Sequence, residues 1–234
     1  MKKIINNLIL ICLICAFLPV IPASAEDDFQ LWTTVTASGK FDPTSKFYWY
    51  LEGQPRIGDD AHYIERLLIR GAAGYELSPN LIAWLGYGWT PLYMNSNYEH
   101  DFQNETRIFE QVTYDQKFDK FSLSHRARLE EREIDGVSTT AVRFRYLLRG
   151  SLPLIKLEGS SLIGLSAYDE YFYNLNSTSP KIASGPDRNR LFAGPYWKND
   201  FVRVDLGYLL ETSERIDKSD RHIHALATYV SFNF

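Results

Sequence analysis

Apolar and cationic side chains alternate between residues 140 and 151, and this alternation restricts the fold more than any other feature of the chain. The two sets are Val142, Phe144, Tyr146 and Leu148 against Arg143, Arg145, Leu147 and Arg149. A period of two residues places the sets on opposite faces of a β-strand. The segment therefore predicts a strand with one apolar and one largely cationic face.

Residues 120–132 repeat this pattern. Their apolar residues Phe121, Leu123, Ala127 and Leu129 alternate with Arg126, Arg128, Glu130 and Arg132. An Arg or Lys that faces lipid near the middle of a bilayer costs about 2–4 kcal/mol, so several of them in one strand require a polar interior. If such strands cross a membrane, their charged faces must point into the lumen of a barrel.

Eleven segments favour β-strands, because they are rich in aromatic and β-branched residues and are bounded by turn residues. They are residues 29–37, 46–56, 62–77, 80–92, 105–117, 120–132, 140–151, 156–172, 188–197, 200–212 and 222–234. No apolar stretch after residue 25 approaches the length of a membrane helix, and a bilayer can otherwise be crossed only by a closed barrel. We therefore expect an all-β protein, a closed antiparallel transmembrane β-barrel.

The count of eleven segments conflicts with antiparallel closure, because single-chain bacterial barrels that close antiparallel have an even number of strands. Residues 29–37 could lie outside the wall, one long stretch could hold two strands, or one strand could be missing from the set. We expect ten to twelve strands and favour twelve.

The predicted connections alternate in length. The short ones are residues 78–80, 118–120, 152–154 and 198–200, and the longer ones are about 93–104, 133–139, 173–187 and 213–221. Outer-membrane barrels have short periplasmic turns and longer extracellular loops. The alternation thus also predicts which end of the barrel faces which compartment.

The two termini predict export to the outer membrane of a Gram-negative envelope. Residues 1–25 combine Lys2 and Lys3 with an apolar stretch and a small-residue site that ends at Ala25, which is typical of a cleaved signal peptide rather than a membrane anchor. We expect residues 26–234 to form a single barrel domain. Its last strand alternates up to Phe234, like the signal by which the barrel-assembly machinery recognises its substrates during insertion.

Charge and cysteine content exclude several functions. Removal of Lys2 and Lys3 from the 25 Lys and Arg leaves 23 basic against 29 acidic residues, which argues against nucleic acid as a partner. Both cysteines, Cys12 and Cys15, precede residue 26. The exported chain would therefore have no disulfide and no thiol nucleophile.

Twelve charged residues are candidates for lining the lumen. They are Arg66, Arg70, Arg107, Arg126, Arg128, Glu130, Arg132, Arg143, Arg145, Arg149, Glu170 and Arg190. Together with Glu76, Glu105 and Glu158 they would form hydrogen-bonded ion pairs across the interior. Two interpretations stay open: a network that stiffens a narrow barrel, or a water-filled path for small anionic solutes.

Aromatic residues near the strand ends predict girdles that contact outer-membrane lipid and lipopolysaccharide, with a sugar-binding platform as the alternative. They are Trp32, Tyr48, Trp49, Tyr50, Trp84, Trp89, Tyr93, Tyr171, Tyr173, Tyr196 and Trp197.

Catalytic and metal motifs give little support for an enzyme. His222 and His224 share one face of the last predicted strand, but carboxylates that would complete a metal or hydrolytic site are not evident beside them. We expect polar rim residues there, no cofactor and no metal. An enzyme that modifies lipid or lipopolysaccharide remains the alternative function.

Five blocks of the sequence resemble the domain of unknown function family 2490. They are residues 123–132, 143–146, 169–174, Asn189-Arg190 with Gly194, and 206–209. The blocks keep their order between about residue 31 and residue 234. The resemblance implies an outer-membrane barrel and supplies no catalytic residues. From the charged residues themselves we expect a lumen that is either plugged or weakly conducting, in a protein that acts in permeability, envelope integrity or adhesion.

Overall fold

The computed structural model describes residues 28–58, 62–96, 99–179, 182–214 and 220–234, with the backbone alone for the segments within 92–103. The predicted signal peptide, residues 1–25, lies outside these residues. The described chain contains no helix long and apolar enough to cross a membrane.

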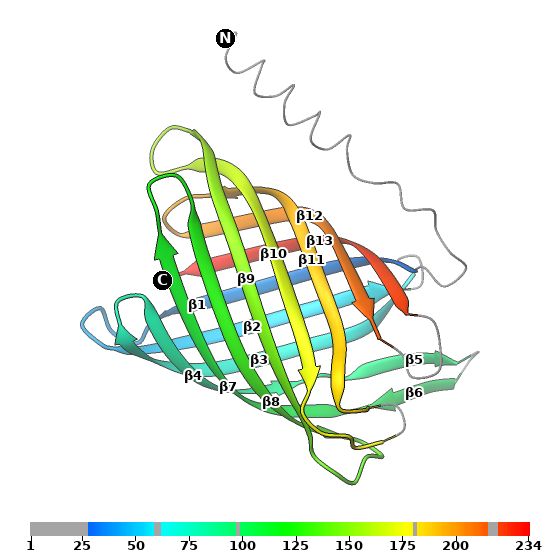
Figure 1. The fold of residues 1–234 in the computed structure, drawn as a ribbon. Coiled ribbons are helices and arrows are strands. Elements are labelled where there is room, and N and C mark those ends of the chain that lie inside the picture. The colour runs from blue at the N-terminus through cyan, green and yellow to red at the C-terminus, as the bar shows by residue number, and fades with distance from the viewer. Residues whose placement is uncertain (1–27, 59–61, 97–98, 180–181, 215–219) are drawn as a thin grey trace.

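The described residues form an all-β protein (Figure 1). Its strands are β1 (Asp28–Lys40), β2 (Phe47–Gly58), β3 (Tyr63–Ser78), β4 (Leu81–Trp89), β5 (Leu92–Ser96), β6 (Glu99–Gln103), β7 (Glu105–Lys117), β8 (Ser122–Ile134), β9 (Ala141–Lys156), β10 (Leu162–Asn174), β11 (Gly185–Lys198), β12 (Val202–Ser213) and β13 (Arg221–Asn233).

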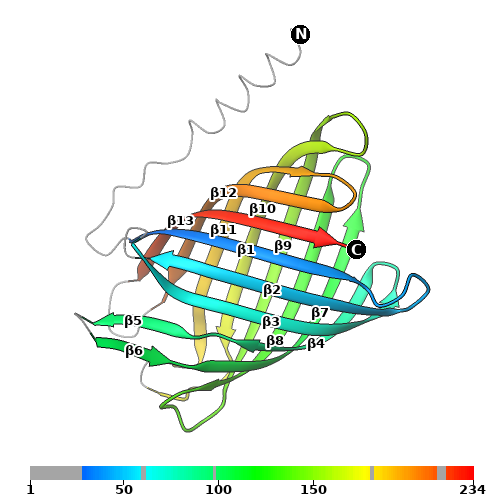
Figure 2. The same cartoon turned by 180° about the vertical axis from the view of Figure 1, so that it is seen from behind.

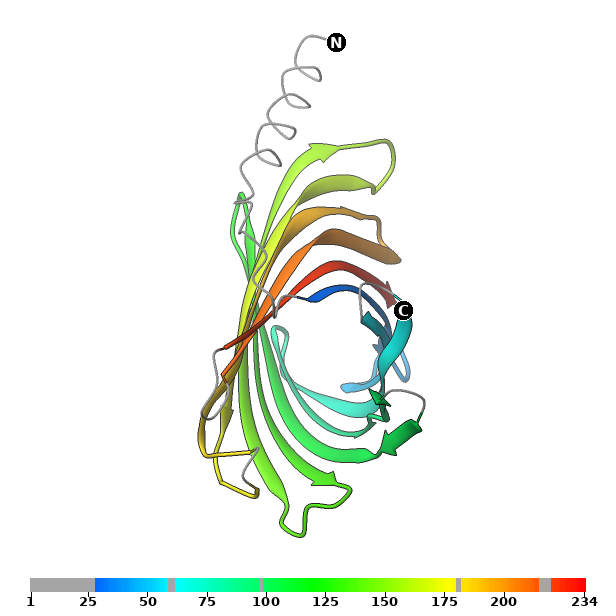
Figure 3. The same ribbon diagram turned by 90° about the vertical axis from the view of Figure 1, so that its right-hand side faces the viewer.

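Eleven of these strands close into a barrel, as the nearly end-on view in Figure 3 shows. The wall runs from β1 through β2, β3, β4 and β7 to β13, each strand antiparallel to the next. β13 then pairs with β1 in parallel, in a register that aligns Leu31 with Leu226 and Val35 with Val230. The two strands lie side by side in Figure 2 and point the same way.

The prediction of a closed all-β barrel is confirmed, but the preference for twelve strands was wrong. An even count follows only if the first and last strands meet antiparallel, and here they meet in parallel, which requires an odd number. All eleven predicted segments contribute to the wall, including residues 29–37, which belong to β1. Odd barrels with this property exist elsewhere.

One feature of the fold was missed. Strands β5 and β6 form an extra hairpin where the sequence predicted a loop at 93–104. The hairpin extends from the wall beside β3, to which it is joined by the pair Arg66 and Leu92 (Figure 1).

The two ends of the barrel differ in the length of their connections, as predicted, with one exception. Residues 41–46, 79–80, 118–121, 157–161 and 199–201 join strands at one end, which we call the short-turn end. The connections at the opposite, long-loop end have six or more residues, except for the one between β2 and β3. The predicted turn at 152–154 was wrong, because β9 continues to Lys156. Pro153 is tolerated within the strand at a register shift opposite Gly164, where the ladder is already irregular.

The wall has an apolar outer face and a polar inner face. In β9 the outward Phe144, Tyr146 and Leu148 are exposed, whereas the inward Arg143 and Arg145 are buried. The exposed apolar residues of other strands include Leu51, Ile69, Leu85, Ile108, Leu191, Leu206 and Leu226. This distribution is the reverse of that in a water-soluble protein, which exposes its charges and buries its apolar side chains.

Part of the interior is nevertheless apolar. Inward residues of β1 and β9–β13 form one buried cluster: Trp32, Leu147, Tyr168, Phe192, Leu209, Ile223, Ala225 and Ala227. Trp32 was predicted for an interfacial girdle, and Tyr50, Trp84 and Tyr196, predicted with it, also line the interior or are buried. The prediction was wrong for these aromatics because each lies at an inward-facing position of its strand. Tyr93 lies where no side chain is described.

Candidate functional site

The twelve predicted lumen residues all lie in the interior of the barrel. Nine are buried: Arg70, Arg107, Arg128, Glu130, Arg132, Arg143, Arg145, Glu170 and Arg190. Arg66, Arg126 and Arg149 are half-buried and line interior cavities. Their functional role is a separate question, which depends on how they are paired.

Glu130 on β8 is the most enclosed acid of this set, with no exposed surface. Its carboxylate accepts a hydrogen bond from Arg145 Nη1 at 2.5 Å and one from Arg143 Nη2 at 2.7 Å. Both arginines project from β9, the neighbouring strand. A buried carboxylate between two guanidinium groups keeps its charge because each oxygen has a cationic donor.

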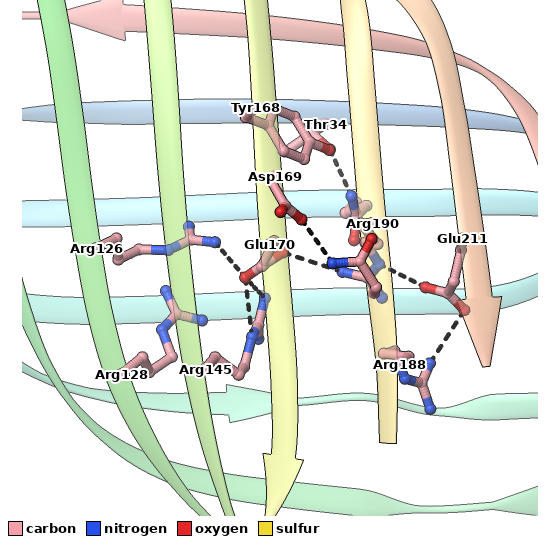
Figure 4. Close-up of polar contacts among 12 residues, drawn as sticks. Thr34, Arg126, Arg128, Arg145, Tyr168, Asp169, Glu170, Arg188, Arg190 and Glu211 are labelled. Atoms are coloured by element: carbon pink, nitrogen blue, oxygen red, sulfur yellow. Dashed lines mark hydrogen bonds and ion pairs between the residues drawn. The ribbon is translucent and has the colours of Figure 1, made fainter. Parts of the chain in front are cut away.

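Glu170 on β10 is a second centre of the network (Figure 4). It accepts hydrogen bonds from Arg145 Nη2 at 2.6 Å and from Arg126 Nη2 at 2.7 Å, and Arg190 Nη1 lies 3.5 Å from its other oxygen. Arg145 thus bridges Glu170 and Glu130.

Further ion pairs lead from Arg190 back to Arg143 on β9. Arg190 Nε lies 2.5 Å from Glu211, whose other oxygen is 3.2 Å from Arg188 (Figure 4). Arg188 in turn pairs with Asp187 at 2.9 Å, and Asp187 pairs with Arg143 at 3.1 Å. The result is a closed circuit of alternating charges, the ion-pair ring: Glu130, Arg145, Glu170, Arg190, Glu211, Arg188, Asp187 and Arg143.

A β-bulge allows the adjacent residues Asp187 and Arg188 to join this ring. Phe172 pairs with Arg188 and Tyr173 with Pro186, so Asp187 is an extra residue on β11. Neighbours on a regular strand face opposite sides, and a bulge removes that restriction.

Phe172 lies in the middle of the ion-pair ring and is 1 % exposed. The guanidinium carbons of Arg145 and Arg190 are each 4.5 Å from its ring centroid, and those of Arg143 and Arg188 are 5.2 and 5.8 Å away. Each lies within the range of a cation–π contact. One aromatic side chain therefore packs against all four arginines of the ring.

Two cavities flank this region. The larger, of about 320 Å³, reaches toward the short-turn end, where Ser38, Ser124 and Ser231 line it. The smaller, of about 60 Å³, lies toward the long-loop end. Arg70, Arg145 and Arg190 line both cavities.

Both cavities are cationic. The charged lining of the larger is Arg70, Arg126, Arg128, Arg145, Arg149 and Arg190 with Glu52 and Glu170. The charged lining of the smaller, among the described residues, is Arg56, Arg66, Arg70, Arg107, Arg132, Arg143, Arg145, Arg188 and Arg190 with Glu105. Such walls favour anions over cations.

Several participants were not predicted as site residues. Glu52, Arg56, Phe172, Asp187 and Glu211 belong to the interior network, and the alternation of Glu52, Gln54 and Arg56 could have revealed the first two. Of the glutamates expected as partners, Glu105 pairs with Arg107 at 2.7 Å and with Arg132 at 2.5 Å. Glu76 pairs with Lys40 at the short-turn end. Glu158 is exposed in a turn, so its predicted place in the network was wrong.

The two histidines of β13, His222 and His224, lie on the outer face and alternate with the inward Ile223 and Ala225. His222 Nδ1 is 3.2 Å from the Thr212 hydroxyl, and His224 Nδ1 is 2.5 Å from the Tyr208 hydroxyl. Within the part of the chain that the structure describes, no group of three or more His, Cys, Asp or Glu residues could hold a metal ion.

Comparison with known proteins gives a family and no activity. The model of a family described as "Protein of unknown function (DUF2490)" matches residues 29–222. An uncharacterized protein of Methylorubrum extorquens is 29% identical over 214 residues, which are 88% of either chain.

Two solved structures show weak similarity. LpxR from Salmonella typhimurium matches with a TM-score of 0.44 and 9% identity, over 80% of this chain and 83% of that one. The siderophore receptor PirA from Pseudomonas aeruginosa matches with a TM-score of 0.35 and 12% identity, over 79% of this chain and 34% of that one. Neither similarity is strong enough to assign a function.

Proposed function

Because the chain belongs to DUF2490, a family of proteins of unknown function, we propose a role from its own geometry: an outer-membrane β-barrel whose cationic interior is a narrow path for small anionic solutes. The observation that carries this proposal is the inversion of polarity across the wall, apolar outside and arginine-rich inside.

The outer face supports a place in lipid. Leu85 is 60% exposed and Leu51 is 58% exposed, and apolar residues of this kind recur on neighbouring strands around the wall. Exposure of so large an apolar surface to water is unfavourable, whereas its contact with lipid hydrocarbon is not. We further propose that residues 1–25 direct export, that the barrel-assembly machinery inserts the remaining single domain, and that outer-membrane lipid and lipopolysaccharide surround it.

The interior supports a path for anions rather than for cations. In the larger cavity Arg149 lies over the rings of Tyr168 and Tyr229, at 5.2 and 5.7 Å, and has no carboxylate partner among the described residues. Arg128 Nη1 is buried without a hydrogen bond, although it lies 3.5 Å from a carboxylate oxygen of Glu130, which several arginines share. Donors of this kind attract an anion that enters from the short-turn end.

The ion-pair ring and Phe172 limit the path to a small conductance. The two cavities meet only at side chains that the network holds, Arg70, Arg145 and Arg190 among the described residues. Passage from one to the other requires these side chains to move. We therefore propose a narrow and not a wide pore.

The test is conductance in a planar lipid bilayer with a salt gradient. The wild-type protein should show small, anion-selective currents, and the double variant Arg128→Glu/Arg145→Glu should shift selectivity toward cations. Arg149→Glu is a milder variant, since that residue is half-buried and lies outside the ion-pair ring. Lys120→Glu, an equal charge reversal in an exposed turn, is the control. A folded wild-type protein without current would contradict the path.

A lipid- or lipopolysaccharide-modifying enzyme is the second candidate, and the outward pair His222 and Thr212 favours it. A hydroxyl beside an imidazole on a lipid-facing wall could act on a lipid ester. Loss of the gene should then change the lipid A or phospholipid profile. The wild-type gene should restore that profile, whereas the His222→Ala/His224→Ala variant should not.

A further inference from the structure

The smaller cavity holds more positive charge than its protein partners neutralise. Nine arginines line it, with Glu105 as the one acid of the lining among the described residues. Glu105 is already shared between Arg107 and Arg132. The remaining arginines therefore compete for acids that lie outside the cavity wall.

Arg56 is the clearest case of an unneutralised charge. It is 4 % exposed, and its hydrogen bonds go to the neutral Gln54 side chain at 2.9 and 3.3 Å. Its guanidinium carbon lies 3.7 Å from the ring centroid of Trp32. Among the described residues no carboxylate forms an ion pair with it.

Arg66 and Arg70 add to the excess. Arg66 forms no ion pair or hydrogen bond through its side chain with any described residue, although it lines the cavity directly opposite Arg56 in the β2–β3 register. Arg70 Nη1 donates a hydrogen bond to Glu52, and the buried Nε of Arg70 has no hydrogen-bond partner among the described residues. Buried donors are almost always satisfied in native proteins, so Arg70 Nε indicates a missing acceptor.

From these contacts we infer that the smaller cavity is a binding site for a small inorganic oxyanion of the phosphate or sulfate type. The volume of about 60 Å³ exceeds the space that one water molecule needs. The planar guanidinium fork matches the paired oxygens of an oxyanion, which a halide lacks. The anion would be held chiefly by Arg56, Arg66 and Arg70.

This inference deepens the proposed function, because the site lies on the path between the large cavity and the long-loop end. Binding is measured on detergent-solubilised protein and conductance in a bilayer, so the two can fail separately. Binding without conductance would leave the site in place and overturn the path. Conductance without binding would overturn the site alone.

The experiment is calorimetric titration of the full chain, refolded in lipid-free detergent, with sodium phosphate at constant ionic strength. The wild-type protein should bind phosphate, and Arg66→Gln should weaken binding about tenfold or more, the loss expected for one charged hydrogen-bonding group. Lys120→Gln, which removes one positive charge from an exposed turn outside both cavities, should bind like the wild type. The lipid-free detergent excludes a lipid headgroup as the source of the phosphate.

Two results would overturn the inference: a folded wild-type protein that binds no phosphate or sulfate, or equal affinity in wild type and Arg66→Gln. If Arg66→Gln does not refold, Arg66→Lys replaces it, since it keeps the charge and loses the fork. The affinity for phosphate should then fall, while the weaker affinity for chloride stays the same. Unchanged phosphate affinity in Arg66→Lys would also contradict the site.

Discussion

The guanidinium of Arg145 lies 4.5 Å from the ring centroid of Phe172 and donates hydrogen bonds to both Glu130 and Glu170. One side chain thus combines a cation–π contact with two buried ion pairs from different strands. This arrangement joins β8, β9 and β10 across the interior. The following predictions test what depends on it.

Glu170→Gln should lower the free energy of unfolding by about 3–5 kcal/mol, because it leaves three buried or half-buried arginines around a neutral side chain. The measurement is unfolding by denaturant in detergent micelles. Glu131→Gln, a change at an exposed residue on β8, two strands away, should alter the free energy by less than about 0.5 kcal/mol. Equal effects of the two variants would contradict a central role of Glu170.

Phe172→Ala should widen the constriction and raise the single-channel conductance, since it removes the ring against which four arginines pack. It should also cost about 3–5 kcal/mol of stability, as for other buried Phe→Ala changes. The outward Phe144→Ala should leave the conductance as it is. If the ion-pair ring does not restrict the passage of ions, the two variants should have the same conductance.

The parallel closure of the barrel predicts a specific cross-link. In a background without Cys12 and Cys15, cysteines at positions 35 and 230 should form a disulfide, because Val35 and Val230 are register partners on β1 and β13. Cysteines at 35 and 226 should not, since Leu226 pairs with Leu31 instead. An antiparallel closure would not align the first pair. The readout is a non-reducing gel after mild oxidation.

An arginine introduced on the outer face should destabilise the barrel strongly only where it lies deep in the hydrocarbon of the membrane. Leu148→Arg, in the middle of β9, should destabilise the barrel in lipid vesicles by about 2–4 kcal/mol, and Leu154→Arg, near the short-turn end, by about 0–1 kcal/mol. Both side chains are exposed, at 38% and 45%. Equal costs would indicate that water, not lipid, surrounds the wall.

Alternation revealed much of the fold, because a period of two reports directly which face each side chain takes. It located the eleven wall segments and placed residues such as Arg145 and Glu170 in the interior. It could not reveal the parallel pairing of β1 with β13, since closure depends on which distant strands meet and not on the pattern within either one.

Local irregularity explains part of what the sequence did not predict in the site. Asp187 and Arg188 are adjacent, so a regular strand would separate them, and only the bulge on β11 brings both into the ion-pair ring. Glu65 was also not predicted: it is the extra residue at the register shift of β3 opposite Arg56 and Ile57, and its carboxylate accepts a hydrogen bond from Gln30 Nε2 at 2.8 Å. Trp32 was assigned to the membrane interface from its residue type, although it lies on the same face of β1 as the inward Gln30 and Thr34.

The most direct test of the central claim, a barrel in lipid with its charges sheltered inside, is the behaviour of the protein in fractionated cells. The chain should stay with the outer-membrane fraction through a high-salt wash and require detergent for release. Unboiled and boiled samples should then migrate differently on a gel, as folded and unfolded barrels do. A chain that a salt wash releases, or that is found dissolved in the periplasm, would contradict the account.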